Sequence, residues 1–280
     1  MAKTKIIKTI EAGQLREAVI YTPPRKYDTQ QQRAQRSKVT SKAQAASNKK
    51  HQVKRLEYLI AANFEQGDRF VTLTYRDSSL PKNRKEARRQ LRDAIAQIRA
   101  AYKMAGYDLK YIYTTEDKHG DGRIHHHLII SAAPGDIEIL RSLWPYGEID
   151  VETLAKYGAN RAQELAIYML KERKPNGEQG YTCAKVMTQP VIKTEWIDED
   201  CTLTAPRGAV ILEEGKEVTE WAEYYHLKYI RPAPMAAPQP GSRRDENQQN
   251  NQPGQRAPFS LETGINFRKN IAKSTLPALQ

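Results

Sequence analysis

The sequence predicts an α+β fold in which helices pack against a central antiparallel sheet. Local patterns give the order strand, long helix, two strands in close succession, short helix, strand and helix. The two successive strands, at about 109–116 and 123–131, are separated by a turn that contains two glycines and two aspartates. Such a turn favours an antiparallel hairpin. A hairpin among helices indicates an antiparallel sheet with helices against a face.

Each remaining element follows from its local pattern. Apolar residues at helical spacing, followed by a glycine, predict a helix over about 43–63. The β-branched and aromatic run at 69–75 predicts a buried strand. Residues 84–104 show the apolar spacing of a long helix. We also expect helices at 136–144 and 161–173 and strands at 147–154, 191–198 and 208–213.

The composition excludes several classes of protein. Of 280 residues, 39% are hydrophobic and 28% are charged, and the mean hydropathy is −0.76. No apolar run approaches the roughly 20 residues that span a bilayer, and the first residues lack the apolar stretch of a secretory signal. We therefore expect a cytoplasmic protein with no membrane partner. Cys183 and Cys201 provide neither a disulfide framework nor the paired spacing of a structural zinc site.

A local excess of positive charge points to a polyanionic partner. The formal net charge is +12 and the isoelectric point is about 9.5. Residues 1–60 hold 14 Lys and Arg against four Asp and Glu, so most of the excess lies there. A solvated tail would also carry charge, but this concentration favours binding to the phosphates of a nucleic acid.

Composition divides the chain into three segments. Residues 1–42 are polar and basic without a sustained period, which predicts a loosely ordered N-terminal arm. Residues 43–230 contain the predicted helices and strands and are expected to form the folded domain. Residues 231–280 are rich in Pro, Gln and Asn, which predicts a disordered tail.

Three consecutive histidines, His125, His126 and His127, occupy a strand otherwise made of Ile and Leu. Side chains alternate across a strand, so the first and third histidines share one face and His126 points to the other. A single histidine in such a strand would more simply be an interior hydrogen-bonding group. Two imidazoles on one face of an apolar strand instead indicate a metal site.

The partner strand of the predicted hairpin offers a third ligand. Glu116 ends that strand and would lie beside the histidines, although Asp117 competes with it and either could be a simple turn residue. Two imidazoles and one carboxylate leave coordination positions open, as a catalytic ion requires. With a hard carboxylate and phosphate oxygens around it, the ion is expected to be Mg²⁺ or Mn²⁺.

A tyrosine and a lysine on the helix at 161–173 form a second group of candidates. Tyr168 lies away from the apolar stripe of the helix, and Lys171 follows it by three residues. A nearby ammonium or metal ion would help a tyrosine hydroxyl act as a nucleophile. Taken alone, the Tyr-x-x-Lys pattern is equally compatible with an ordinary amphipathic helix.

Together these pieces resemble the HUH endonucleases, in particular the rolling-circle replication initiators (Rep proteins) of plasmids and phages. FVTLTY at 70–75 is similar to the first strand motif of that family, and GRIHHHLII at 122–130 to its His-hydrophobic-His motif. YMLK at 168–171 is similar to its Tyr-x-x-Lys motif. The resemblance covers roughly residues 45–230 and implies a palm-like sheet related to that of RRM domains.

The resemblance implies a metal-dependent endonuclease and strand transferase that nicks single-stranded DNA at an origin. In that scheme His125, His127 and Glu116 hold the ion, and Tyr168 attacks the scissile phosphate. The products are a 5′-phosphotyrosine and a free 3′-hydroxyl, with Lys171 stabilising the phosphate or phenolate charge. The implied partners are single-stranded or supercoiled origin DNA and a host helicase and polymerase, in the cytoplasm of a bacterial host.

The sequence departs from the family pattern at two points, and two other functions compete. The middle residue of the histidine motif is His126 instead of an aliphatic residue, and the helix carries a single tyrosine, with Tyr157 eleven residues away. A relaxase or transposase of the same superfamily would use the same site. A non-catalytic RRM-like module would instead stack bases on Phe70, Tyr111 or Tyr113.

Overall fold

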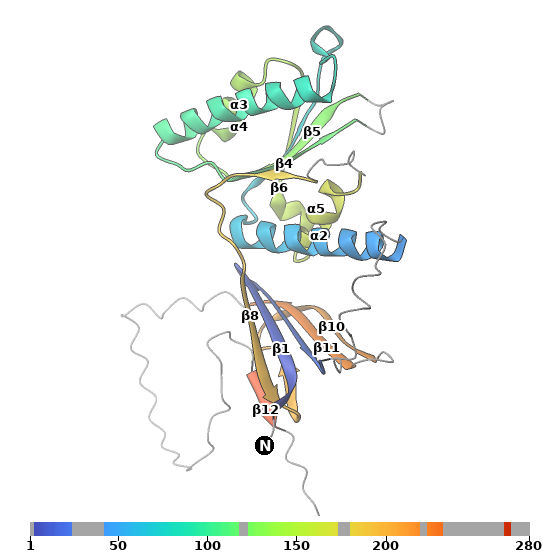
Figure 1. Ribbon diagram of the computed structural model, residues 1–280. Helices are drawn as coiled ribbons and strands as arrows, with labels where there is room; N and C mark the ends of the chain where they lie inside the picture. Colours follow the sequence, from blue (N-terminus) through green and yellow to red (C-terminus); the bar gives the residue numbers. More distant parts are fainter. Residues whose placement is uncertain are drawn as a thin grey trace, which may run out of the picture. The chain divides into compact units, whose positions relative to one another are not determined.

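The computed structural model describes residues 3–23, 42–117, 123–172, 180–218, 223–231 and 266–269. Contacts divide the chain into two compact units (Figure 1). Thr29–Pro190 is called here the inserted unit, and Met1–Asp28 together with Val191–Gln280 is called the terminal unit. Each contains an antiparallel five-stranded sheet. The predicted α+β class is therefore confirmed, whereas the second sheet was not expected from the sequence.

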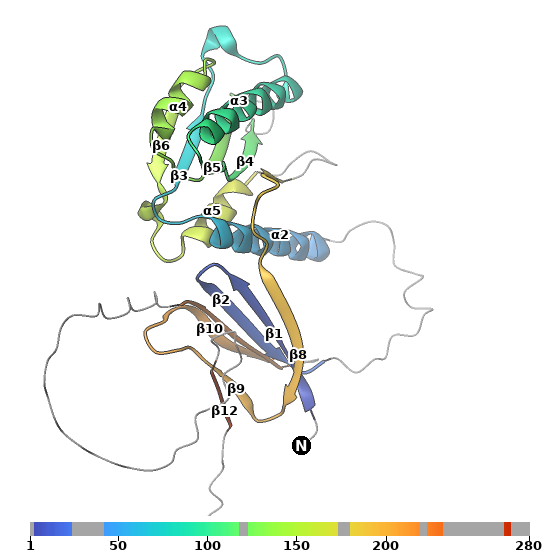
Figure 2. The same cartoon turned by 90° about the vertical axis from the view of Figure 1, so that its left-hand side faces the viewer.

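The inserted unit holds one antiparallel sheet with strand order β6-β3-β5-β4-β7, whose first four strands lie side by side in Figure 2. Its elements agree with the sequence prediction to within about two residues, except that the last helix ends four residues early and β7 was not expected. The strands are β3 (Arg69–Leu73), β4 (Tyr111–Glu116), β5 (His125–Ile130), β6 (Ile149–Thr153) and β7 (Thr182–Cys183). The helices are α2 (Lys42–Asn63), α3 (Arg84–Met104), α4 (Asp136–Leu143) and α5 (Arg161–Met169), with short 3-10 turns at Asp77–Ser79 and Leu154–Tyr157.

Helices cover both faces of this sheet. Helices α3 and α4 lie on one face, and α2 and α5 lie on the other (Figure 1). The central strands are correspondingly buried on both sides: all six residues of β4 are buried, as are all of β5 except its first. A strand buried on both faces does not alternate between apolar and polar residues, which explains the continuous apolar runs in these two segments.

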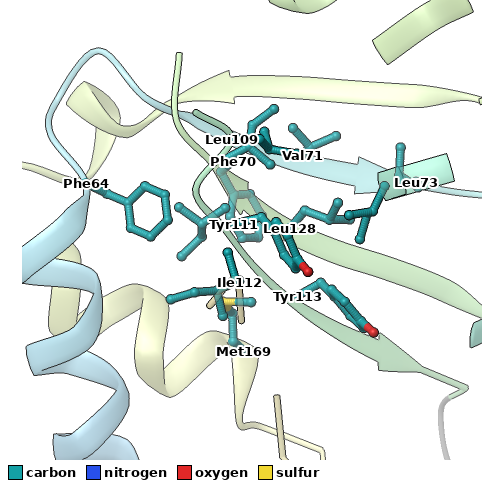
Figure 3. Packing of buried hydrophobic residues seen from close by; sticks show 14 of the residues in the cluster. Phe64, Phe70, Val71, Leu73, Leu109, Tyr111, Ile112, Tyr113, Leu128 and Met169 are labelled. Carbon is teal, nitrogen blue, oxygen red and sulfur yellow. The ribbon is translucent and has the colours of Figure 1, made fainter. Parts of the chain in front are cut away.

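The apolar core of the inserted unit lies on both sides of its central strands. Figure 3 shows part of it, with Ile112 of β4 beside Met169 of α5, and Phe64 at the end of α2 pointing toward the sheet. Helix α3 contributes a stripe at helical spacing that is almost wholly buried. That stripe consists of Ala87, Leu91, Ala94, Ile95, Ile98 and Tyr102.

The start of helix α3 is fixed by its first residues. The Asn83 side chain accepts a hydrogen bond from the backbone N–H of Glu86 at 3.0 Å, and the Glu86 carboxylate accepts one from the backbone N–H of Lys82 at 2.8 Å. This reciprocal cap satisfies N–H groups that the helix itself leaves unpaired. The basic residues of its first two turns are therefore held in a defined place beside the sheet.

The terminal unit is built from both ends of the chain. Its sheet has the order β10-β11-β2-β1-β8, and a small pair joins β9 to β12. A separate core of Ile7, Ala18, Ile20, Leu227 and Tyr229 holds the large sheet together. Its strands are β1 (Lys3–Ala12), β2 (Leu15–Tyr21), β8 (Val191–Asp198), β9 (Cys201–Thr204), β10 (Val210–Val218), β11 (Glu223–Ile230) and β12 (Asn266–Lys269).

The N-terminal segment is a correction to the sequence-based interpretation. The sequence predicts a loosely ordered arm over residues 1–42, whereas residues 3–21 form strands β1 and β2. Ile7 and Ile20 on these strands are 1% exposed, so their burial stabilises the sheet. Their partners β8 and β11 lie about 190 residues or more away in the sequence, and local periodicity carries no signal of so distant a pairing. Most of the expected tail at 231–280, and residues 24–41 of the expected arm, lie outside the described residues.

Among the residues that the structure describes, every helix is too short or too polar to cross a membrane.

Candidate active site

The register of three adjacent strands gathers the predicted metal ligands on one face of the inserted unit's sheet. Glu116 of β4 pairs with His125 of β5, and His127 of β5 pairs with Thr72 of β3. Paired residues of antiparallel strands point to the same face. The face is the one covered by α5, because Tyr168 of that helix packs against His127 with ring centroids 4.9 Å apart.

The three predicted ligands meet through single atoms. Oε2 of Glu116 lies 3.4 Å from Nε2 of His125 and 3.5 Å from Nε2 of His127. The ligand atoms of all three residues lie within 4.8 Å of one another. Glu116 and His127 are 2% exposed, and His125 is partly exposed. The predicted cluster is therefore present, and it can hold a divalent metal ion.

The other nitrogen of each imidazole has its own partner. Nδ1 of His125 lies 3.1 Å from the backbone oxygen of Arg123, and Nδ1 of His127 lies 3.2 Å from Oγ1 of Thr72. A carbonyl oxygen only accepts hydrogen bonds, so Nδ1 of His125 carries the proton and its neutral ring presents a lone pair at Nε2. Such a contact fixes the ring orientation and tautomer of a metal-ligating histidine.

Two buried oxygen atoms support the fit of a cation. Oε1 of Glu116 and Oγ1 of Thr114 are buried without a hydrogen-bond partner among the described residues. Thr114 pairs with His127 across β4 and β5, so both oxygens are on the ligand face. Leaving a buried carboxylate oxygen unpaired is costly. A bound ion would satisfy it, and the donor set of two imidazoles and one carboxylate suits such an ion.

Charge at the cluster shifts the pKa values of its members. Burial raises the pKa of Glu116, but hydrogen bonds from His125, His127 and Lys171 outweigh burial and hold that pKa well below its ordinary value. The hydrogen bond to Glu116 raises the pKa of His125. Burial lowers the pKa of His127, against the opposing effect of Glu116. The carboxylate is thus ionised and His127 favours its neutral form, which are the states that ligate metals.

His126 occupies the opposite face, as the alternation predicts. It is fully buried, with Nε2 2.9 Å from the Tyr75 hydroxyl and Nδ1 2.9 Å from Oγ1 of Thr115. Trp144 packs edge-on against its ring. Burial, together with positively charged neighbours, lowers the pKa of His126 to about 3. It is a neutral interior residue with both ring nitrogens engaged.

Asp117, the alternative third ligand, points elsewhere. Its carboxylate lies 3.1 Å from the Arg84 guanidinium, and its backbone N–H donates to Glu172 at 3.2 Å. Within the described residues the metal-ligating cluster contains Glu116 and not Asp117. The structure thus separates two candidates between which the sequence left the choice open.

Tyr168 reaches the cluster from α5. Its hydroxyl lies 3.4 Å from Nε2 of His127, and its side chain is 41% exposed. Phe70 of β3 packs edge-on against the Tyr168 ring and is stacked on His127. The hydroxyl therefore stands at the metal cluster while remaining accessible to a large substrate.

Lys171 joins the tyrosine to the carboxylate. Helix α5 ends at Met169, so Lys171 lies just beyond the helix predicted over 161–173, in a turn where its N–H donates to the Tyr168 carbonyl at 3.2 Å. Its Nζ lies 3.8 Å from the centroid of the Tyr168 ring and 3.1 Å from Oε2 of Glu116. Burial lowers the pKa of Lys171, but hydrogen bonds to Tyr168 and Glu116 outweigh it and raise that pKa.

Sequence reasoning missed part of the support around these residues. It assigned Thr72 to packing or general site support, without the specific contact to His127. It gave no role to Arg84, which donates to the Thr115 carbonyl and pairs with Asp117 and, at 3.9 Å, with Glu172. Pairing of β3 with β5 could have suggested the first contact, but the second joins a helix to a strand end and has no local signal.

The base-stacking alternative loses its proposed aromatic residues. Phe70, Tyr111 and Tyr113 are 5%, 8% and 3% exposed, so none of them offers a ring face to a base. The prediction that they stack on nucleic acid is therefore wrong. Their burial follows from the helices on both faces of the sheet, where an RNA-binding sheet of the RRM type uses an open face.

Residues 68–173 match a family model for replication-associated proteins of the ORF2 type. The match covers little more than a third of the chain, from the start of β3 to just past α5, and includes every residue of the candidate site. It supports a role as a replication initiator, a protein that acts on origin DNA. No curated protein and no solved structure was found to match the chain.

Proposed function

We propose that the chain is a replication initiator that nicks single-stranded DNA by metal-assisted attack of Tyr168, in the manner of a single-tyrosine HUH endonuclease. The observation that carries the proposal is the meeting of four groups at one place. The Tyr168 hydroxyl, the Lys171 ammonium and the ligand atoms of the cluster Glu116, His125 and His127 converge on one face of the sheet. The family match adds an independent link to replication.

Glu116, His125 and His127 would hold the metal ion, for which Mg²⁺ and Mn²⁺ are the candidates because a carboxylate and phosphate oxygens are hard ligands. When bound, the ion would supply Lewis acidity that polarises a phosphoryl oxygen. Thr72 and the Arg123 carbonyl keep the two imidazoles oriented. This division of labour leaves Tyr168 free of the metal-binding role and available as nucleophile.

In the proposed step the phenolic oxygen of Tyr168 forms a bond to phosphorus and the bond from phosphorus to the 3′-oxygen breaks. The phenolic proton passes to solvent, and the departing 3′-oxygen takes up a proton to become a hydroxyl. Lys171, next to the tyrosine ring, stabilises negative charge on the phenolate and the phosphate. The products are a 5′-phosphotyrosine and a free 3′-hydroxyl, from which a host polymerase can extend.

The origin DNA would have to be single-stranded or locally opened for a strand to reach this site. Supercoiling or a host helicase would supply that opening, since the sequence contains no GxxxxGK[ST] nucleotide-binding motif. The match to replication-associated proteins favours this role over that of a relaxase or transposase with the same chemistry.

The test is covalent trapping on a denaturing gel. The full chain is incubated with labelled single-stranded oligonucleotides from the DNA around its own gene, with Mn²⁺ or with EDTA. We expect a slowly migrating band that requires the metal and disappears in Tyr168→Phe but persists in Tyr157→Phe. Tyr157 is a matched control, because it is also packed against Phe70 but hydrogen-bonds to Glu152. A band that persists in Tyr168→Phe would contradict the proposal.

A further inference from the structure

A row of basic side chains on α3 lies beside the candidate site and takes no part in the chemistry proposed above. The row, called here the α3 basic stripe, consists of Arg84, Lys85, Arg88 and Arg92. These four side chains line one surface hollow of about 270 Å³. Their spacing places them along one side of the first turns of α3, away from its buried apolar stripe.

The stripe begins next to the residues of the site. Arg84 donates to the carbonyl of Thr115 and pairs with Asp117 at 3.1 Å, so it touches the residues on both sides of Glu116. It also lies 3.9 Å from Glu172, the neighbour of Lys171. Figure 1 shows the beginning of α3 on the same side of the inserted unit as the loop end of β4 and β5. The stripe is therefore an extension of the site's surface.

Much of the positive charge in the stripe is not neutralised by the protein. In the described part of the chain, neither Lys85 nor Arg92 has an acidic partner, whereas Arg89 outside the hollow lies 3.8 Å from Glu86. Like charges gathered in one hollow repel each other unless an anion lies among them. The arrangement suits a ligand with several negative charges in a row.

The length of the stripe matches a nucleic-acid backbone. From Arg84 to Arg92 the helix rises about 12 Å, and a DNA strand carries one phosphate per roughly 3.4 Å of axis in a duplex and fewer per unit length when extended. The stripe can therefore contact about two or three consecutive phosphates. A single small anion would engage only part of it.

We infer that the α3 basic stripe binds the phosphate backbone of the DNA strand that enters the site, next to the scissile phosphate. This inference rests on the proposed function. It assigns to Lys85, Arg88 and Arg92 a role in holding the strand, with no part in the bond that breaks. The strand is the proposed partner, and a flanking duplex is the alternative that the experiment separates.

The test measures binding without cleavage. The full chain carrying Tyr168→Phe is titrated in EDTA against labelled single-stranded oligothymidine and against a hairpin duplex, at 50 to 300 mM salt. The stripe variant adds Lys85→Gln, Arg88→Gln and Arg92→Gln. The matched control adds Lys103→Gln, Arg141→Gln and Lys185→Gln, which remove the same charge from exposed positions outside the stripe. Thermal melts confirm that both variants are folded.

We expect the stripe variant to bind the single strand about tenfold or more weakly at 100 mM salt. The slope of log Kd against log salt should fall by about two, because each lost phosphate contact removes roughly 0.7 from it. The control should keep the parent's slope. Equal slopes for the stripe variant and its control would overturn the inference, as would a loss confined to the duplex. If the parent itself fails to bind single strands, the proposed function is wrong as well.

Discussion

The two faces of strand β5 use the same residue type for different ends. On one face His126 is enclosed by Tyr75, Thr115 and Trp144, and both of its ring nitrogens have protein partners. On the other face His125 and His127 each direct one nitrogen toward Glu116, and that carboxylate keeps one buried oxygen without a partner among the described residues. A histidine with both nitrogens engaged is structural, whereas a pair with lone pairs directed at one carboxylate is ready to bind a cation.

The difference comes from what lies over each face. Helix α3 and the segment around Trp144 close the His126 side with aromatic and hydroxyl groups. Helix α5 brings Tyr168 over the other side, where 41% of that side chain stays exposed. Substitutions on the two faces should therefore have opposite signatures: loss of metal binding and chemistry on one, loss of stability on the other.

The largest effect is expected on the ligand face. His127→Ala removes one of three ligands, so metal-dependent formation of the covalent adduct should fall by about 10³-fold or more, since a bound ion contributes several kcal/mol to the transition state. Quantitative gel assays over a range of Mn²⁺ concentrations measure this loss. An adduct formed by His127→Ala at the parent's rate and metal dependence would show that the cluster is not the metal site.

Removing the charge of Lys171 should have the next largest effect. Lys171→Gln keeps a polar side chain but loses the ammonium next to the tyrosine ring and Glu116. We expect single-turnover cleavage to slow by about 10²-fold, the effect of losing one charge-stabilising donor. Lys171→Arg, which retains the charge, is the control and should recover part of the rate. Equal rates for the two variants would refute the electrostatic role.

On the opposite face, substitution should cost stability. His126→Leu installs an aliphatic residue, as in the family motif that this sequence resembles, and deprives the Tyr75 and Thr115 hydroxyls of a buried partner. The free energy of unfolding should fall by about 2 kcal/mol, while the affinity for Mn²⁺ stays unchanged. Denaturant unfolding and metal titration measure the two quantities. A weakened metal site with unaltered stability would reverse the assignment of the two faces.

The smallest effect is expected at a residue that only orients a ligand. Thr72→Val keeps the shape of the side chain but removes the contact from Oγ1 to Nδ1 of His127. Loss of such a partner typically weakens metal binding about tenfold or more. Isothermal titration with Mn²⁺ measures the change, and Thr74→Val, whose hydroxyl lies 3.3 Å from the Glu148 carbonyl instead, is the control.

Metal binding itself offers a direct comparison of the faces. With Mn²⁺ at a hundred times its Kd, the parent should gain about 2.7 kcal/mol in free energy of unfolding, because the ion binds the folded state alone. His126→Leu should show the same gain from a lower starting point. Glu116→Gln should show none, and a full gain in that variant would place the ion elsewhere.

Sequence reasoning could predict the ligand cluster because its signals are local. Alternation along one strand separates His126 from its two neighbours, and a short hairpin brings Glu116 beside His125. It could not choose between Glu116 and Asp117, because the choice depends on Arg84, which binds Asp117 from a helix about 30 residues earlier. The end of α5 was also missed, since a turn after Met169 continues the helical apolar pattern without its backbone hydrogen bonds.

The fold was predictable where the strands are near neighbours in sequence. The inserted unit pairs β4 with β5 through one short loop, and its helices have clear apolar stripes. The terminal unit pairs β1 with β8, and the lysines of KTKIIKTIEA suggest a basic arm when this segment is considered alone. Only the distant partner strands bury Ile7 and Ile10, so the sheet is defined by contacts that no local window contains.

The most direct test of the central claim is to identify the tyrosine that carries the DNA. After reaction with Mn²⁺ and digestion with trypsin and nuclease, mass spectrometry can distinguish the peptide 162–171, which contains Tyr168, from the peptide 157–161, which contains Tyr157. We predict a nucleotide phosphate on Tyr168, present with metal and absent with EDTA. A modification on Tyr157, or on Tyr168 in the absence of metal, would contradict the account.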